Sequence, residues 1–148
     1  ARYSPEKKEM LDFLVDAFNR EVAGLEDVEV WIHTCWGNPN MQKVFSDESY
    51  ANSMEIYLER LKGDVWTIEA TENNFKELPL FDRFRNSLKK KIAVGVISHR
   101  TLQVERPDEV ADLIRRALKY IEPERMIQNS TQPQRKPNAR PYPSRRKT

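Results

Sequence analysis

Apolar residues recur at helical spacing near the start of the chain. Ser4 followed by Pro5 is a typical helix start, with Ser as the N-cap and Pro at the first helical position. Gly24 is a typical residue for the end of such a helix. Between them, spacings of three and four predict one buried face formed by Met10, Leu11, Leu14, Val15, Phe18 and Val22.

Extended and helical patterns then alternate along the rest of the chain. β-Branched and aromatic runs predict strands at 27–36, 65–69 and 92–97, with a fourth beginning at 125–128. Amphipathic spacing predicts helices at 47–61, 77–88 and 107–118. Their inward faces would comprise Tyr50, Met54, Tyr57, Leu58, Leu61, Leu80, Phe81, Phe84, Leu88, Val110, Leu113, Ile114, Ala117 and Leu118.

This alternation indicates an α/β protein with a parallel sheet and helical crossovers. Three or four such strands can form a small open doubly wound sheet or part of a (β/α)₈ barrel, and spacing alone leaves both open. The chain has 148 residues, which predicts one domain but is short of the roughly 250 residues of a complete barrel.

Composition narrows the class of protein. Apolar residues make up 39% of the chain and charged residues 32%, which is ordinary for a soluble globular protein. No apolar run approaches the ~20 residues that cross a bilayer, and no signal peptide is visible, so we expect no membrane partner. The single cysteine excludes an internal disulfide and fits the reducing cytoplasm, where we expect the protein to be.

Basic residues are concentrated at the end of the chain. Residues 131–148 contain six Lys or Arg, four Pro and no acidic residue, so with a total charge of +2 the residues before them carry −4. Few apolar side chains are present to offset the entropy of ordering, which predicts a basic, Pro-rich disordered tail at 128–148 after a domain at 1–127. Because the domain itself is acidic, we expect no nucleic-acid partner.

Four polar residues follow or end the predicted strands. His33 and Cys35 close the first strand, Glu69 closes the second, and His99 follows the third. Alternate residues of a strand point to the same side, and the C-terminal edge of a parallel sheet is where α/β proteins place their sites. His, Cys and carboxylate are all zinc ligands. The spacing also fits a buried cysteine and a structural histidine, so both interpretations stay open at this point.

Four segments together resemble a known family. They are His33–Asn38 (HTCWGN), Val65–Ala70 (VWTIEA), Val94–Ala111 and Ile114–Arg125. In order and spacing they are similar to the C-terminal, zinc-binding catalytic domain of cobalamin-independent methionine synthases. Short single-barrel relatives such as the epoxyalkane:coenzyme M transferases belong to the same group.

The resemblance implies a partial (β/α)₈ barrel, with this chain covering roughly its second half. It implies zinc as the cofactor, with His33, Cys35 and Glu69 as metal ligands and His99 as a catalytic general acid. In the family a second Cys, in an Asp-Cys-Gly sequence, completes the ligand set. Here the corresponding stretch, 128–134, is QNSTQPQ and contains no cysteine.

The implied function is transfer of a methyl or alkyl group to a thiol. The resemblance implies a homocysteine-like thiol as acceptor and a donor such as methyltetrahydrofolate, in its polyglutamate form 5-methyltetrahydropteroyltriglutamate. Whether such a fragment is active alone is left open, and its unpaired strand edges predict self-association. A non-catalytic α/β interaction module with a basic binding tail and a small open-sheet enzyme with another ligand are the alternatives.

Overall fold

The computed structural model describes residues 4–35, 49–71, 74–98 and 104–130. Within them the protein is a four-stranded parallel sheet whose strands are joined by helical segments, as the sequence predicts. In chain order the elements are α1 (Pro5–Glu21), β1 (Trp31–Thr34), the π-helix η2 (Ile56–Arg60), β2 (Val65–Glu69), the 3₁₀-helix η3 (Leu78–Phe84), β3 (Lys91–Ile97), α2 (Pro107–Ala117), the 3₁₀-helix η4 (Pro123–Arg125) and β4 (Met126–Ser130).

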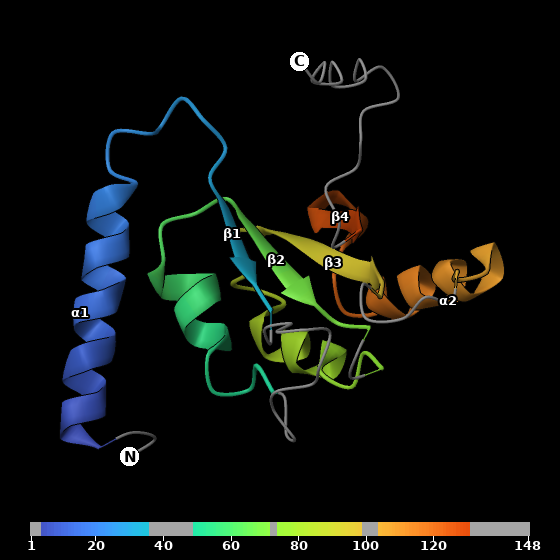
Figure 1. Ribbon diagram of the computed structural model, residues 1–148, viewed down its shortest axis with the longest axis horizontal. Coiled ribbons are helices and arrows are strands. Elements are labelled where there is room, and N and C mark those ends of the chain that lie inside the picture. The colour runs from blue at the N-terminus through green and yellow to red at the C-terminus, as the bar shows by residue number, and fades with distance from the viewer. Residues whose placement is uncertain (1–3, 36–48, 72–73, 99–103, 131–148) are drawn as a thin grey trace, which may run out of the picture.

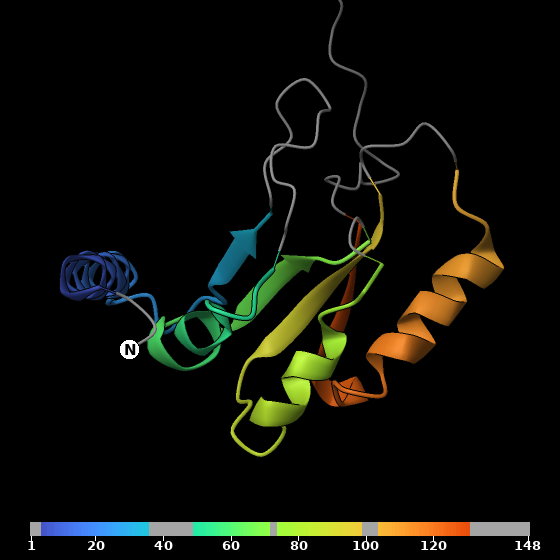
Figure 2. The same ribbon diagram turned by 90° about the horizontal axis from the view of Figure 1, so that it is seen from below.

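The order of the strands decides between the two architectures that the sequence left open. Neighbours in the sheet are neighbours in the chain, in the order β1-β2-β3-β4, and all pairs are parallel. The described helical segments between the strands, η2, η3 and α2, lie on one side of the sheet (Figures 1 and 2). A doubly wound sheet reverses its strand order and is covered on both faces, whereas a (β/α)₈ barrel keeps sequential order with all helices outside. The fold is therefore part of a (β/α)₈ barrel.

One face of the sheet forms the hydrophobic core with these connecting segments. Trp66 lies at its centre, fully buried, stacked on Tyr57 at 4.9 Å between ring centroids and in edge contact with Tyr50 at 5.4 Å. The other strand positions on this face alternate with it: Ile32, Ile68, Ile92, Val94 and Val96. Helices and turns supply Met54, Leu58, Leu78, Phe81, Phe84, Ala117 and Ile121.

The opposite face corresponds to the interior of a barrel. On β2 it presents Val65, Thr67 and Glu69, all nearly inaccessible to solvent, and on β3 it presents Ala93. Burial on both faces is typical of parallel strands, which explains why β2 shows no polar alternation. His33 lies on the same face of β1, and it is exposed because β1 is an edge strand.

Two of the connecting segments differ from the predicted α-helices: η2 is a π-helix, which is wound more loosely, and η3 is a 3₁₀-helix, which is wound more tightly. Of the helix predicted at 47–61, residues 49–61 are described, and in them the helical turn at Met54 and Glu55 leads into the π-helix η2. Its last turn closes with a bond from the Leu61 amide to the Ile56 carbonyl. The helix predicted at 77–88 is the 3₁₀-helix η3. Its buried residues Leu78, Phe81 and Phe84 recur every third position, which fits the three residues per turn of that helix.

Helix α1 begins as predicted, because the Ser4 side chain accepts a hydrogen bond from the Lys7 amide. It lies beside β1 and η2 (Figure 1), where Asn19 bonds the backbone of Arg60 and Lys62. The predicted buried face is wrong at Met10 and Leu14, whereas Val15 is buried and Phe18 is half-buried against the core. Met10, Phe13 and Leu14, here called the α1 stripe, are 60%, 66% and 54% exposed.

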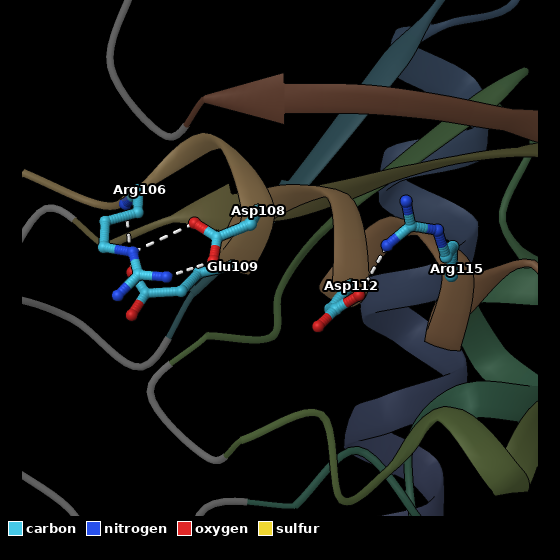
Figure 3. A network of polar contacts seen from close by, with 5 residues as sticks. All are labelled: Arg106, Asp108, Glu109, Asp112 and Arg115. Atoms are coloured by element: carbon cyan, nitrogen blue, oxygen red, sulfur yellow. Dashed lines mark hydrogen bonds and ion pairs between the residues drawn. The ribbon is translucent and has the colours of Figure 1, made fainter.

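Helix α2 is stabilised locally by polar contacts at its surface (Figure 3). The Arg106 amide donates to the Glu109 carboxylate at 2.9 Å, and the Arg106 guanidinium bonds Asp108. One turn further on, Arg115 pairs with Asp112. The paired side chains are exposed, so each ion pair contributes little to stability. The contacts of Arg106 with Asp108 and Glu109 cap the start of the helix.

Candidate metal centre

The predicted ligands His33, Cys35 and Glu69 lie at one edge of the sheet, where β1 and β2 end. His33 pairs with Thr67 across these strands, and the same register continued by two residues places Cys35 beside Glu69. His33 and Cys35 are exposed, whereas Glu69 is 1% exposed. The arrangement of the first two strands therefore brings Cys35 and Glu69 to neighbouring positions on one face.

The hydroxyl of Tyr50 connects these two strand ends. It donates to the Thr34 carbonyl and accepts from the Glu69 amide, each at 3.3 Å. Burial raises the pKa of Tyr50 to about 12, and these hydrogen bonds oppose the shift. The hydroxyl thus contacts the backbone of Glu69 and of Thr34, the residue before Cys35, so the two strand ends meet at one buried oxygen.

The carboxylate of Glu69 is oriented by the residue two positions later. Its Oε1 accepts a 2.9 Å hydrogen bond from the Thr71 amide and a second, short one from the Thr71 hydroxyl. A buried carboxylate is stable only when such donors compensate for lost hydration. In this structure Glu69 is directed toward Thr71, so coordination of a metal would require its side chain to turn or to share that oxygen.

No preassembled site with three ligands is present in the described ranges. Among residues 4–35, 49–71, 74–98 and 104–130, no three His, Cys, Asp or Glu side chains are grouped so that they could hold a metal ion. Strand β4 extends to Ser130, with Asn129 opposite Gly95, and brings no cysteine to this edge. The donor types of His33, Cys35 and Glu69 suit zinc.

His99, the predicted catalytic residue, lies outside the described residues, as do Trp36 and Asn38. Next to His99 in the chain, the Ser98 amide donates to the Glu105 carboxylate at 2.7 Å. The sequence did not predict this bond, because a carboxylate near the start of a helix is usually solvated. Glu77, which accepts a hydrogen bond from the Tyr50 amide at 2.5 Å, was not predicted to have a role for the same reason.

The loop after β2 is shaped by a second constraint near Glu69. Asn74 and Phe75 have positive φ angles of 54° and 58°, a conformation that costs energy for non-glycine residues. Arg116 of α2 stabilises it by donating to the Asn74 carbonyl at 2.7 Å and lying over the Phe75 ring at 5.5 Å. Phe75 itself is buried. Contacts of Arg116 therefore stabilise the backbone conformation of Asn74 and Phe75.

Fold and site together define a class: a (β/α)₈-barrel segment with catalytic-type polar residues at the C-terminal edge of its strands. The chain belongs to the family described as cobalamin-independent synthase, catalytic domain, whose model matches residues 3–131. This is an enzyme family, and the resemblance found in the sequence is confirmed. Within the described residues, no helix is long and apolar enough to cross a membrane.

Similar proteins include methionine synthases of archaea. The protein from Thermococcus kodakarensis is 30% identical over 115 residues, which cover 78% of this chain and 30% of the relative. That from Sulfolobus acidocaldarius is 29% identical over 118 residues, covering 80% of this chain and 30% of the relative. The chain thus spans about a third of the length of the relatives that it matches.

A solved structure agrees with the fold. A B12-independent methionine synthase from a Shewanella species, in complex with selenomethionine, superposes with a TM-score of 0.67 at 24% identity. The match covers 83% of this chain and 36% of the other. It supports the assignment as part of a barrel.

Proposed function

We propose that this chain contributes the metal-binding part of a zinc-dependent enzyme that transfers a methyl group to a thiol. Family membership supports the reaction class. The single observation that supports the site is that the buried Tyr50 hydroxyl bonds the backbone of Glu69 and of Thr34, the residue before Cys35, at the C-terminal end of the sheet. A homocysteine-like thiol as acceptor and a methyltetrahydrofolate-type donor agree with the names of the relatives.

The proposed ligands are His33, Cys35 and Glu69. They fit zinc in donor type, since imidazole, thiolate and carboxylate are its usual protein ligands. They also fit in placement, because β1 and β2 end side by side. Glu69 must rearrange from its bonds to Thr71, and exposed His33 must turn toward the edge. We therefore infer that the site assembles when metal binds.

Each residue has a defined task in this reaction. His33 and Cys35 bind only after losing their protons, so affinity falls at acid pH. When bound, zinc favours the thiolate form of a substrate thiol, the nucleophile in the transfer. The substrate sulfur forms a bond to the methyl carbon as the bond between the methyl group and its donor breaks. The donor leaves with the electron pair of that bond. His99 is proposed to donate the proton that this leaving group needs.

Calorimetric titration with zinc near neutral pH tests the ligand assignment. We expect one zinc per chain, loss of binding in Cys35→Ser, and no change in Glu29→Gln, a control at the opposite end of β1. Equal affinity of wild type and Cys35→Ser would show that the metal binds elsewhere.

A gain of affinity provides a second test. The chain offers three protein ligands where the family has four, so one more position is left for water and affinity should be modest. Replacing Asn129-Ser130-Thr131 by Asp-Cys-Gly, at the end of β4, should tighten zinc binding. No gain, in a variant whose circular dichroism is unchanged, would contradict the assumed position of the fourth ligand.

A further inference from the structure

Tyr50 is held in place by contacts of its backbone, its ring and its hydroxyl. Its backbone amide donates to the Glu77 carboxylate at 2.5 Å, its ring meets Trp66 edge-on, and its hydroxyl bonds both Thr34 and Glu69. The side chain is 5% exposed. A tyrosine with so many attachments has one position for its hydroxyl, and that position is between two strands.

The register shows what the hydroxyl does there. The Val65 amide donates to the Val30 carbonyl, and in a parallel ladder this pattern repeats at every second residue. The Glu69 amide therefore faces the Thr34 carbonyl. This donor–acceptor pair is the last one between the two strands before β1 ends, and is here called the last rung. These are the two groups that the Tyr50 hydroxyl bonds, so it lies in that rung and links both strands through its own oxygen.

We propose that Tyr50 is a positioning residue, whose hydroxyl sets the spacing of the β1 and β2 ends and thereby the distance between Cys35 and Glu69. This inference rests on the proposed function for its link to zinc. Cys35 directly follows Thr34, and Glu69 is bonded to the hydroxyl through its own amide, so a change in this rung moves both ligands. In this role the hydroxyl acts as a hydrogen-bond donor and acceptor and stays protonated throughout.

Two matched variants separate the hydroxyl from the ring. Tyr50→Phe keeps the edge contact with Trp66 and removes the hydroxyl. Tyr57→Phe makes the same change in the other tyrosine that contacts Trp66, and that residue has no bond to either strand end among the described interactions. Any effect on the aromatic cluster is therefore common to both variants, and an effect on the strand ends is specific to Tyr50.

The first measurement is amide hydrogen exchange in the metal-free protein, with the Val94 amide in the middle of the sheet as reference. Tyr50→Phe should accelerate exchange at Glu69 about tenfold relative to Val94, as expected for loss of one hydrogen bond. Tyr57→Phe should leave that ratio unchanged. Global destabilisation would accelerate both amides, so the ratio reports the rung itself. An unchanged ratio in Tyr50→Phe overturns the inference.

The second measurement is the zinc dissociation constant of the same proteins. We expect it to rise about tenfold in Tyr50→Phe and to stay constant in Tyr57→Phe. Faster exchange at Glu69 with unchanged zinc affinity would overturn the link to the ligands. If wild type binds no zinc, the proposed function fails, while faster Glu69 exchange in Tyr50→Phe still supports Tyr50 as the group that spaces the two strands.

Discussion

Lys90 is a buried cation whose removal should stabilise the protein. It precedes β3 and is 8% exposed, with its ammonium donating to the Leu61 carbonyl at 2.5 Å. Burial lowers the pKa of Lys90 to about 8, against a partial opposing effect of Asp64. An ordinary lysine titrates near ~10.4, and each pKa unit is about 1.4 kcal/mol, so the charged form costs at most about 3 kcal/mol in the folded state.

Lys90→Met keeps the aliphatic stem and removes this cost, but it also removes the bond to Leu61. That bond has a charged donor and returns roughly 1.5–3 kcal/mol, so we expect a net gain of at most about 1.5 kcal/mol in the free energy of unfolding at pH 7. The exposed neighbour Lys89 supplies the control variant Lys89→Met, which should change stability little.

The pH dependence gives the sharper test. Because the pKa is lower in the folded state, the unfolded chain binds more protons between pH ~8 and ~10.4, and wild-type stability rises across this window. The advantage of Lys90→Met should therefore be greatest below pH ~8 and shrink above it. Urea unfolding followed by circular dichroism at several pH values measures the difference. A variant less stable than wild type at neutral pH, or a gap independent of pH, would refute the reasoning.

Three further outcomes are expected. A Cβ at Gly63 would lie 2.6 Å from the buried Ile32 side chain, so Gly63→Ala should destabilise by about 1–3 kcal/mol in thermal melts. Thr34→Val leaves the buried Trp66 indole N–H without its 2.9 Å acceptor and should cost about 1–3 kcal/mol, whereas Thr34→Ser should cost clearly less; equal losses would contradict this. The α1 stripe should promote self-association, so Leu14→Glu should reduce the sedimentation coefficient; a monomeric wild type would refute this.

Much of the fold could be predicted because its signals are local. The strand β2 and the edge residue Glu69 follow from one short β-branched run and its end. Parallel pairing follows from alternation with helices. The exact form of the connecting helices could not be predicted, since the spacing of Leu78, Phe81 and Phe84 suits an α-helix or a 3₁₀-helix, and the choice depends on the sheet against which they pack.

The burial of Met10 and Leu14 on α1 was predicted incorrectly for a related reason. Its apolar spacing is genuine, but the part of the chain that the structure describes leaves the α1 stripe uncovered. Periodicity shows which side of a helix suits a partner and does not show that the partner is present.

The position of the candidate site could be predicted in part. Strand ends and donor types are visible in sequence, so His33, Cys35 and Glu69 could be proposed as ligands, and that assignment stays a prediction. The contribution of Tyr50 was not predicted, since its pattern marked it as one more core residue, and burial with aromatic contacts indeed accounts for its ring. Its hydroxyl bonds depend on the register of two strands that lie before and after it in the chain.

The two ends of the sheet differ in their relation to the proposed ligands. At the N-terminal end, Gly63 packs against Ile32 and the Val30 amide donates to the Asp64 carboxylate, and none of these residues is a proposed ligand. At the C-terminal end the two strand ends are linked by a side-chain hydroxyl, that of Tyr50. Substitutions at the N-terminal end should therefore change the free energy of unfolding without changing zinc affinity. Loss of the Tyr50 hydroxyl should change both, because it removes a hydrogen bond and also alters the distance between Cys35 and Glu69.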